Sequence, residues 1–221
     1  MKTPSALLFD LDGTLVDSAP DIAAALNAAL SDQSLDTVSL DQARQWIGGG
    51  APALVSRALA AQQPRATDEN ARYFLQTLLT HYRHENGRHG APYPGVVQTL
   101  AVIAERGIPM ACVTNKPEQL ARDLLVQYDM PITQVTGGDT LSVKKPNPAP
   151  IVHTAKQLAV DATACWMVGD SAADAGAARH AGSAFIWVDY GYHQDDNAET
   201  LAPDAVLSDF KGLLALLDSA K

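Results

Sequence analysis

Acidic residues gather at the end of an apolar run near the start of the chain. Residues 6–22 read ALLFDLDGTLVDSAPDI, in which Asp10 and Asp12 close the run and Gly13-Thr14 follows. Residues two apart along a strand share a face, and Gly13 permits the turn that would bring both carboxylates to a ligand. Taken alone, this pattern is more typical of a solvated surface turn. It indicates a binding site only if the rest of the chain supplies further ligands or positive charge.

Two later apolar runs, 109–115 and 164–170, also end in polar residues. In open α/β sheets, ligands bind outside the carboxyl ends of the strands, so these ends and the first one are expected to meet. Each cluster by itself is more typical of a helix cap than of a binding site, and a Lys-Lys-Pro stretch alone would be a solvated loop. Their coincidence at three strand ends favours one joint site. The residues that form these two clusters are, in chain order, Thr114, Asn115, Lys116, Gly169, Asp170 and Asp174.

These residue types suit phosphate chemistry. Asp170 would join Asp10 and Asp12 in an oxygen cage for Mg²⁺, which binds through a few carboxylates plus phosphate. The metal ion would let a carboxylate approach a phosphate dianion and attack phosphorus, giving an aspartyl-phosphate. A second carboxyl group would protonate the leaving oxygen and later activate water, while a hydroxyl and a lysine would stabilise the developing charge.

The elements that must position these groups follow an alternating pattern of short apolar runs and amphipathic segments. Continuous apolar runs are typical of parallel strands covered on both faces, so the chain is expected to form an open α/β sheet with right-handed crossovers. Strands are expected near 6–11, 109–115, 132–137, 164–170, 184–190 and 204–209, and helices near 94–106, 117–128, 148–159, 172–181 and 210–218.

One interval breaks the alternation. Residues 17–92 contain only helix-like segments, and the interval is too long for a simple crossover between the first two strands. It is therefore expected to be an inserted α-helical cap domain, with residues 1–16 and 93–221 forming the α/β core.

Composition limits the partners. The chain has 221 residues and a formal charge of −9, so a basic surface for nucleic acid or an anionic membrane is not expected. The start of the chain resembles neither a signal peptide nor a membrane span. Cys112 and Cys165 lie in apolar runs and are expected to be reduced core residues, which favours a cytoplasmic protein. Oligomeric state is left open between monomer and homodimer.

Four stretches carry a resemblance to a known family. DLDGTLVDS, VTNKP, KKPNPAP and MVGDSAADAGAARHAG are similar to the four successive motifs of the haloacid dehalogenase superfamily of phosphatases. They span residues 10–182, most of the chain. The resemblance implies a Rossmann-like core with a helical cap inserted after the first strand, and a small phosphate ester as substrate.

The resemblance also implies residue roles. Asp10 would be the nucleophile and Asp12 the general acid/base. Asp170 would bind Mg²⁺ with Asp10 and the backbone carbonyl of Asp12, and Asp174 would support the metal indirectly. The phosphoryl group would be bound, in this reading, by Thr114, Asn115 and Lys145, of which Lys145 is preferred to Lys144 because the family lysine directly precedes proline.

Further stretches, such as WIGGGAPALVSRAL and YGYH, resemble the bacterial phosphoglycolate phosphatases of that superfamily. This implies 2-phosphoglycolate as the leading substrate, with a sugar phosphate or nucleotide as the alternative. A phosphomutase, a dehalogenase and a metabolite-binding regulatory protein are the remaining readings, each less favoured. Two departures stand out: Gly49 occupies a position where the family has Asn, and Ala172-Ala173 precede Asp174 where it has a basic residue and Asn. The second departure removes neighbouring hydrogen bonds that support metal binding.

The cap loop raises the question of specificity. Gly48 to Gly50 are either a backbone amide cradle for a small carboxylate, with Gly49 and Gly50 binding substrate, or a flexible turn between helices. Arg57 is either a contact for that carboxylate or a solvent-facing cation. A cap of this size is expected to close over a small substrate and exclude bulk water.

Overall fold

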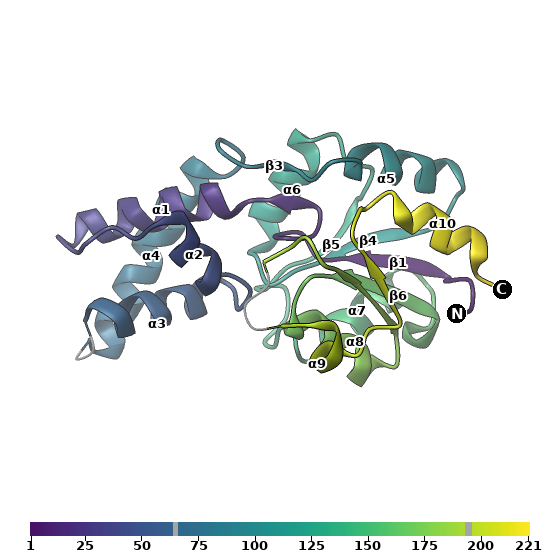
Figure 1. Cartoon of the computed structure of the whole chain (residues 1–221). Coiled ribbons are helices and arrows are strands. Elements are labelled where there is room, and N and C mark those ends of the chain that lie inside the picture. The colour runs from purple at the N-terminus through teal and green to yellow at the C-terminus, as the bar shows by residue number, and fades with distance from the viewer. Residues whose placement is uncertain (64–65, 193–195) are drawn as a thin grey trace. The chain divides into compact units, whose positions relative to one another are not determined.

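The computed structural model describes residues 1–63, 66–192 and 196–221 and divides into two compact units (Figure 1). Of the stretch YGYH, His193 lies outside the described residues. Two short strands, β2 (Val16–Asp17) and β3 (Ala91–Pro92), lie where the chain passes from one unit to the other. Unit 1 comprises Met1–Asp17 and Pro92–Lys221, and unit 2 comprises Ser18–Ala91.

A six-stranded parallel sheet forms the centre of unit 1, as expected from the apolar runs. From β1 the chain proceeds outward through β4 and β5, then returns to the other side of β1 for β6, β7 and β8. This reversal is the topological switch point at which open α/β sheets bind ligands. The strands, in spatial order, are β5 (Gln134–Thr136), β4 (Met110–Val113), β1 (Ala6–Phe9), β6 (Cys165–Gly169), β7 (Ala184–Val188) and β8 (Ala205–Leu207).

Both faces of this sheet are buried, which explains why its strands are continuous apolar runs. In β1, Leu7 and Phe9 join one core cluster while Ala6 and Leu8 join the other. Cys112 and Cys165 are buried free thiols, one in each cluster, as expected. The first face is covered by α5 (Val96–Glu105), α6 (Glu118–Gln127) and α10 (Gly212–Ser219) (Figure 1). The second face is covered by α7 (Ala149–Gln157), α8 (Ala172–Ala181) and α9 (Ala198–Leu201). A short 3-10 turn, η1 (Ala162–Ala164), precedes β6.

Unit 2 is helical, as the sequence predicts. Its longest helix, α4, buries Phe74, Leu78 and Tyr82, which recur every four residues and so form one apolar face. The side chain of Thr67 caps this helix by accepting a hydrogen bond from the backbone N–H of Asn70. The helices are α1 (Ala19–Asp32), α2 (Leu40–Trp46), α3 (Ala51–Gln62) and α4 (Asp68–Glu85).

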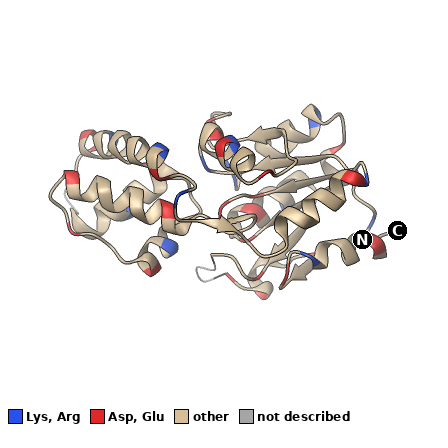
Figure 2. Ribbon diagram, turned by 90° about the horizontal axis from the view of Figure 1, so that it is seen from above, with Lys and Arg blue, Asp and Glu red and all other residues tan. Residues whose placement is uncertain are grey.

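Charge is dispersed over both units. Figure 2 shows Lys and Arg scattered among Asp and Glu, so an anionic substrate would be held by local contacts. Among the described residues, no helix is long and apolar enough to cross a membrane.

A buried carboxylate organises the end of unit 2. Asp21, in the first turn of α1, is fully buried. Its side chain accepts hydrogen bonds from the backbone N–H groups of Gly87, His89 and Gly90, at 2.9, 2.6 and 3.1 Å. These donors offset the cost of burying the charge and fix the segment that leads back to unit 1.

We expect Asp21→Asn to lower the free energy of unfolding by about 2 kcal/mol, because the amide keeps one acceptor oxygen but turns an NH₂ group toward backbone donors. Urea denaturation followed by far-UV circular dichroism measures the change. Asp32→Asn, at the other end of α1, is the matched control, since Asp32 is half-exposed and contacts His81 at the surface. It should cost less than about 1 kcal/mol, and equal losses in the two variants would contradict the assigned role of Asp21.

Candidate active site

Three strand ends supply the site. Asp10 directly follows β1, Thr114 follows β4, and Asp170 follows β6. Because β1 pairs with both β4 and β6, the three ends are adjacent at the carboxyl edge of the sheet. The structure therefore brings together residues that are more than a hundred positions apart in the sequence.

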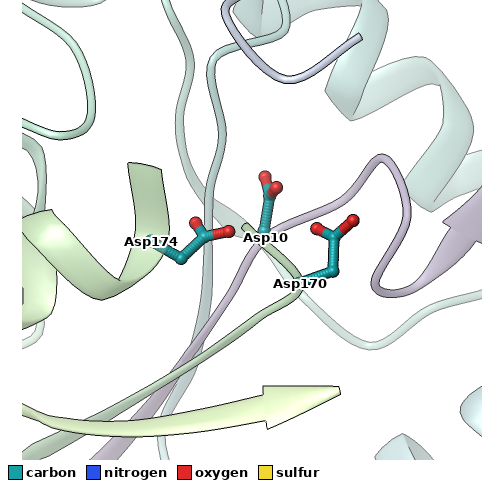
Figure 3. Close-up of side chains that lie close together, drawn as sticks. All are labelled: Asp10, Asp170 and Asp174. Atoms are coloured by element: carbon teal, nitrogen blue, oxygen red, sulfur yellow. The ribbon is translucent and has the colours of Figure 1, made fainter. Parts of the chain in front are cut away.

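Three buried carboxylates converge at this edge. One oxygen from each of Asp10, Asp170 and Asp174 lies within 4.8 Å of the others, and Figure 3 shows the three carboxylates projecting into the same space. Asp174 comes from the first turn of α8, where its Oδ2 accepts hydrogen bonds from the N–H and hydroxyl of Ser171 at 3.2 and 2.6 Å. This local cap fixes Asp174 with its second oxygen facing the site.

Lys145 provides the compensating positive charge. Its Nζ lies 2.9 Å from Oδ1 of Asp10 and 2.6 Å from Oδ1 of Asp174, and the side chain is 1% exposed. Nζ also donates to the backbone carbonyl of Val113, at the end of β4. One ammonium group thus ties together two of the three carboxylates and the neighbouring strand.

A second buried lysine contacts Asp12. Nζ of Lys116 donates a hydrogen bond to Oδ1 of Asp12 at 3.1 Å, and its side chain is fully buried. The motifs assign Lys116 no role of its own. A signal was present, because Lys116 follows Thr114 by two residues, the same spacing that relates Asp12 to Asp10.

Asp170 is held by Thr14, which belongs to the first motif, and by Trp187 and Tyr192, which lie outside the four motifs. Thr14 donates its hydroxyl to Oδ1 at 3.2 Å, and the backbone N–H of Tyr192 donates to Oδ2 at 2.8 Å. The indole N–H of Trp187 donates to the Asp170 carbonyl at 3.1 Å. Trp187 and Tyr192 reach Asp170 through the pairing of β6 with β7, which sequence spacing does not reveal.

Burial and mutual repulsion shape the titration of the site. Burial raises the pKa of Asp10 to about 6; Lys145 opposes this rise, while Asp174 and Asp12 add to it. The pKa of Asp170 is raised well above its usual value by burial and then by Asp10 and Asp174. Burial lowers the pKa of Lys145, but Asp10 and Asp174 more than offset this and raise it overall. Lys145 is therefore a permanent cation.

The donor set fits a divalent cation. Four carboxylates, those of Asp10, Asp12, Asp170 and Asp174, face the ammonium groups of Lys116 and Lys145, which leaves an excess of two negative charges when all are ionised. Carboxylate oxygens are the ligands preferred by hard ions such as Mg²⁺. A bound divalent cation would offset the mutual repulsion that, together with the larger effect of burial, raises the pKa values of Asp10 and Asp170.

Thr114 and Asn115, expected at the phosphoryl group, lie beside the carboxylates. Thr114 is buried and its Oγ1 accepts the backbone N–H of Lys116 at 3.2 Å, which leaves its hydroxyl proton for another acceptor. The side-chain NH₂ of Asn115 donates to the carbonyl of Lys145 at 3.0 Å. Asn115 thus also positions the segment that carries Lys145.

The remaining predicted residues belong to unit 2. Gly50 is the N-cap of α3 with a φ of 78°, a conformation that favours glycine. A Cβ on Gly49 would lie 2.6 Å from Cβ of Ala53, so this turn is too tight for a side chain without a shift. Arg57 is half-buried, and its guanidinium donates to the carbonyls of Trp46 and Ile47 at 2.6 and 3.5 Å, so that it caps the end of α2.

Comparison with known proteins agrees with this arrangement. Residues 7–188 match the model of the haloacid dehalogenase-like hydrolase family. A phosphoglycolate phosphatase of Aliivibrio fischeri is 39% identical over 220 residues, covering 97% of each chain. A plasmid-encoded phosphoglycolate phosphatase of Cupriavidus necator is 41% identical over 226 residues, covering 98% of this chain and 94% of that one.

The fold is matched by a solved structure. The crystal structure of a predicted phosphoglycolate phosphatase from Haemophilus somnus superimposes with a TM-score of 0.91 at 32% identity, covering 98% of this chain and 99% of that one. The match includes both the sheet and the helical insertion, as the coverage requires. The chain therefore belongs to the haloacid dehalogenase-like hydrolase family, in which its enzyme class is that of the phosphatases.

Proposed function

We propose that this phosphatase is a Mg²⁺-dependent phosphomonoesterase that works through an aspartyl-phosphate on Asp10 and converts 2-phosphoglycolate to glycolate and phosphate. The observation that carries the mechanism is the contact of buried Lys145 with both Asp10 and Asp174, beside Asp170. The names of the two relatives described above support the choice of substrate.

The metal would be held by Asp10, Asp170 and the backbone carbonyl of Asp12, with Asp174 acting indirectly. When bound, Mg²⁺ supplies positive charge that offsets the repulsion between the carboxylates and a phosphate dianion. The protein positions its ligands in advance, because Asp170 is already fixed through both carboxylate oxygens and Asp174 through its cap.

In the first half of the reaction, a carboxylate oxygen of Asp10 attacks phosphorus. The bond from phosphorus to the ester oxygen breaks, and Asp12 gives that oxygen a proton, so glycolate leaves with a neutral hydroxyl group. Lys145, Thr114 and Asn115 would bind the non-bridging phosphoryl oxygens, where charge is spread in the transition state. Lys116 keeps Asp12 in one orientation for this transfer.

In the second half, water attacks the phosphorus of the aspartyl-phosphate. Asp12, now a carboxylate, accepts a proton from this water, and the bond between Asp10 and phosphorus breaks. Inorganic phosphate is released, the Asp10 carboxylate is restored and Asp12 again carries its proton. Atoms and charge therefore balance over the two halves.

Substrate selection is assigned to the inserted helical domain, residues 17–92, and catalysis to the core formed by 1–16 and 93–221. We infer that the backbone N–H groups of Gly49 and Gly50 bind the carboxylate of the substrate. The tight packing of Gly49 against Ala53 supports this, because it keeps the loop free of a side chain that would cover those groups.

Asp10→Asn should reduce kcat by at least about 10³-fold, because the amide is a poor nucleophile and breaks the ion pair with Lys145. Intact-mass spectrometry of enzyme quenched during turnover should show one added phosphoryl group in the unaltered protein and none in the variant. Asp123→Asn, at an exposed position on α6, is the matched control and should retain full activity. Substantial turnover by Asp10→Asn would rule out the covalent mechanism.

A panel of phosphate esters tests the substrate. We expect kcat/KM for 2-phosphoglycolate to exceed that for a hexose phosphate or a nucleoside monophosphate by about tenfold or more, since only it offers a small carboxylate to the glycine loop. Activity should vanish with a chelator and return with Mg²⁺. A preferred sugar phosphate or nucleotide would reject the substrate but leave the phosphatase intact. Isomerisation of a sugar phosphate would instead indicate a phosphomutase, and binding without phosphate release a regulatory protein.

Gly49→Ala should raise KM for 2-phosphoglycolate by about tenfold, because the new methyl group displaces the loop from its position against Ala53. The double variant Gly49→Ala/Ala53→Gly restores the space and should recover most of the affinity. The effect should be much smaller for an aryl phosphate that lacks a carboxylate. An equal rise in KM for both esters would show that the loop does not bind the substrate carboxylate.

A further inference from the structure

Beyond the four motifs, one segment of the chain encloses Asp170. The family match ends at residue 188, yet Gly191 and Tyr192 lie directly against Asp170, and Tyr190 contacts the backbone of Thr14 beside it. We propose that the segment Tyr190–Tyr192 positions the Asp170 carboxylate and in this way raises the affinity of the site for its metal ion. This inference rests on the metal site of the proposed function.

The first contact is made by the backbone. The N–H of Tyr192 donates to Oδ2 of Asp170 at 2.8 Å, inside a site where Asp170 is 2% exposed. A hydrogen bond to a buried carboxylate is stronger than one between neutral groups, and it selects one rotation of the carboxylate plane. A metal ligand held in this way binds without losing side-chain freedom.

The second contact passes through Thr14. The hydroxyl of Tyr190 donates to the backbone carbonyl of Thr14 at 2.9 Å, and Thr14 in turn donates its own hydroxyl to Oδ1 of Asp170 at 3.2 Å. Tyr190 therefore fixes the residue that donates to Oδ1 of Asp170, whereas Tyr192 donates to Oδ2. The ring of Tyr190 packs on that of Tyr93, with centroids 4.6 Å apart, which fixes the direction of its hydroxyl.

Position 191 requires a glycine because its backbone lies very close to Asp170 and Gly13. A Cβ at this position would lie 2.3 Å from Cβ of Asp170 and 2.5 Å from the carbonyl oxygen of Gly13. Both are too close for any side chain, and Gly13 follows the two reactive acids Asp10 and Asp12 in the chain. The absence of a side chain therefore lets this backbone bridge the ends of β1 and β6.

The segment is anchored at its far end. The hydroxyl of Tyr192 donates to Oδ1 of Asp17 at 2.8 Å, and Tyr192 is 9% exposed. Its backbone thus holds Asp170 while its side chain is fixed within unit 1. The segment therefore donates directly to one oxygen of Asp170 and fixes, through Thr14, the donor to the other oxygen.

The test measures metal affinity separately from activity. The melting temperature of the full chain is followed over a MgCl₂ titration, whose concentration dependence gives an apparent Kd, while the metal-free value reports on the fold. Tyr190→Phe removes one hydroxyl and should raise the Kd for Mg²⁺ by about fivefold. Gly191→Ala should raise it by about tenfold or more, if the variant folds.

Two further variants serve as controls for the Kd measurement. Asp170→Asn should abolish the Mg²⁺-dependent rise, and Tyr128→Phe, on a half-buried tyrosine at the end of α6, should leave the Kd unchanged. For Tyr190→Phe, kcat at saturating Mg²⁺ should approach that of the unaltered chain, because excess metal compensates for a poorly held ligand.

The outcomes separate the two proposals. If Asp170→Asn binds Mg²⁺ normally, the metal site itself is wrong. If Asp170→Asn fails to bind but Tyr190→Phe retains the original Kd and only lowers the metal-free melting temperature, the segment is structural and the inference is overturned. A raised Kd with an unchanged metal-free melting temperature supports it.

Discussion

The central constraint on this structure is that three carboxylates are buried side by side at the carboxyl edge of the sheet, where their charges must be compensated. Asp10 and Asp170 leave neighbouring strands side by side, and Asp174 reaches them from α8. Repulsion and loss of hydration both oppose this arrangement, as the raised pKa values of Asp10 and Asp170 show. It persists because Lys145 lies between two of the carboxylates, and because the Thr14 hydroxyl and the Tyr192 backbone N–H donate hydrogen bonds to the third.

Much of the fold serves this charge balance. The strand order places β1 between β4 and β6, so acids from two strands and a hydroxyl from the third share one edge. Apolar clusters on both faces exclude water from the strands beneath, which strengthens each charged contact above them. The same low dielectric that penalises unpaired charge would strengthen the contacts of the proposed metal ion and phosphate dianion.

The two lysines divide the site in a way that matches a two-step reaction. Lys145 contacts Asp10, the proposed nucleophile, whereas Lys116 contacts Asp12, the proposed proton carrier. Each acid therefore has its own cation, and the two carboxylates are held in separate environments although they are only two residues apart. Such separation of paired carboxylates is the usual basis for assigning them different chemical roles.

The sequence by itself determined the strands, the helical interval and the acids of the motifs, because burial on both faces imposes continuous apolar runs and the site chemistry restricts residue types. Even there, each strand is shorter than its apolar run, and after β1 and β6 the next residues, Asp10 and Asp170, belong to the carboxylate cluster. Tertiary structure alone decided that Lys116 faces Asp12, that Arg57 caps α2, and that Tyr190–Tyr192 encloses Asp170. These contacts join residues whose separation in sequence carries no periodic signal. The pairing of β1 with β4 and of β6 with β7 brings together the residues of the sheet edge, and the packing of α3 beside α2 brings Arg57 to the end of α2.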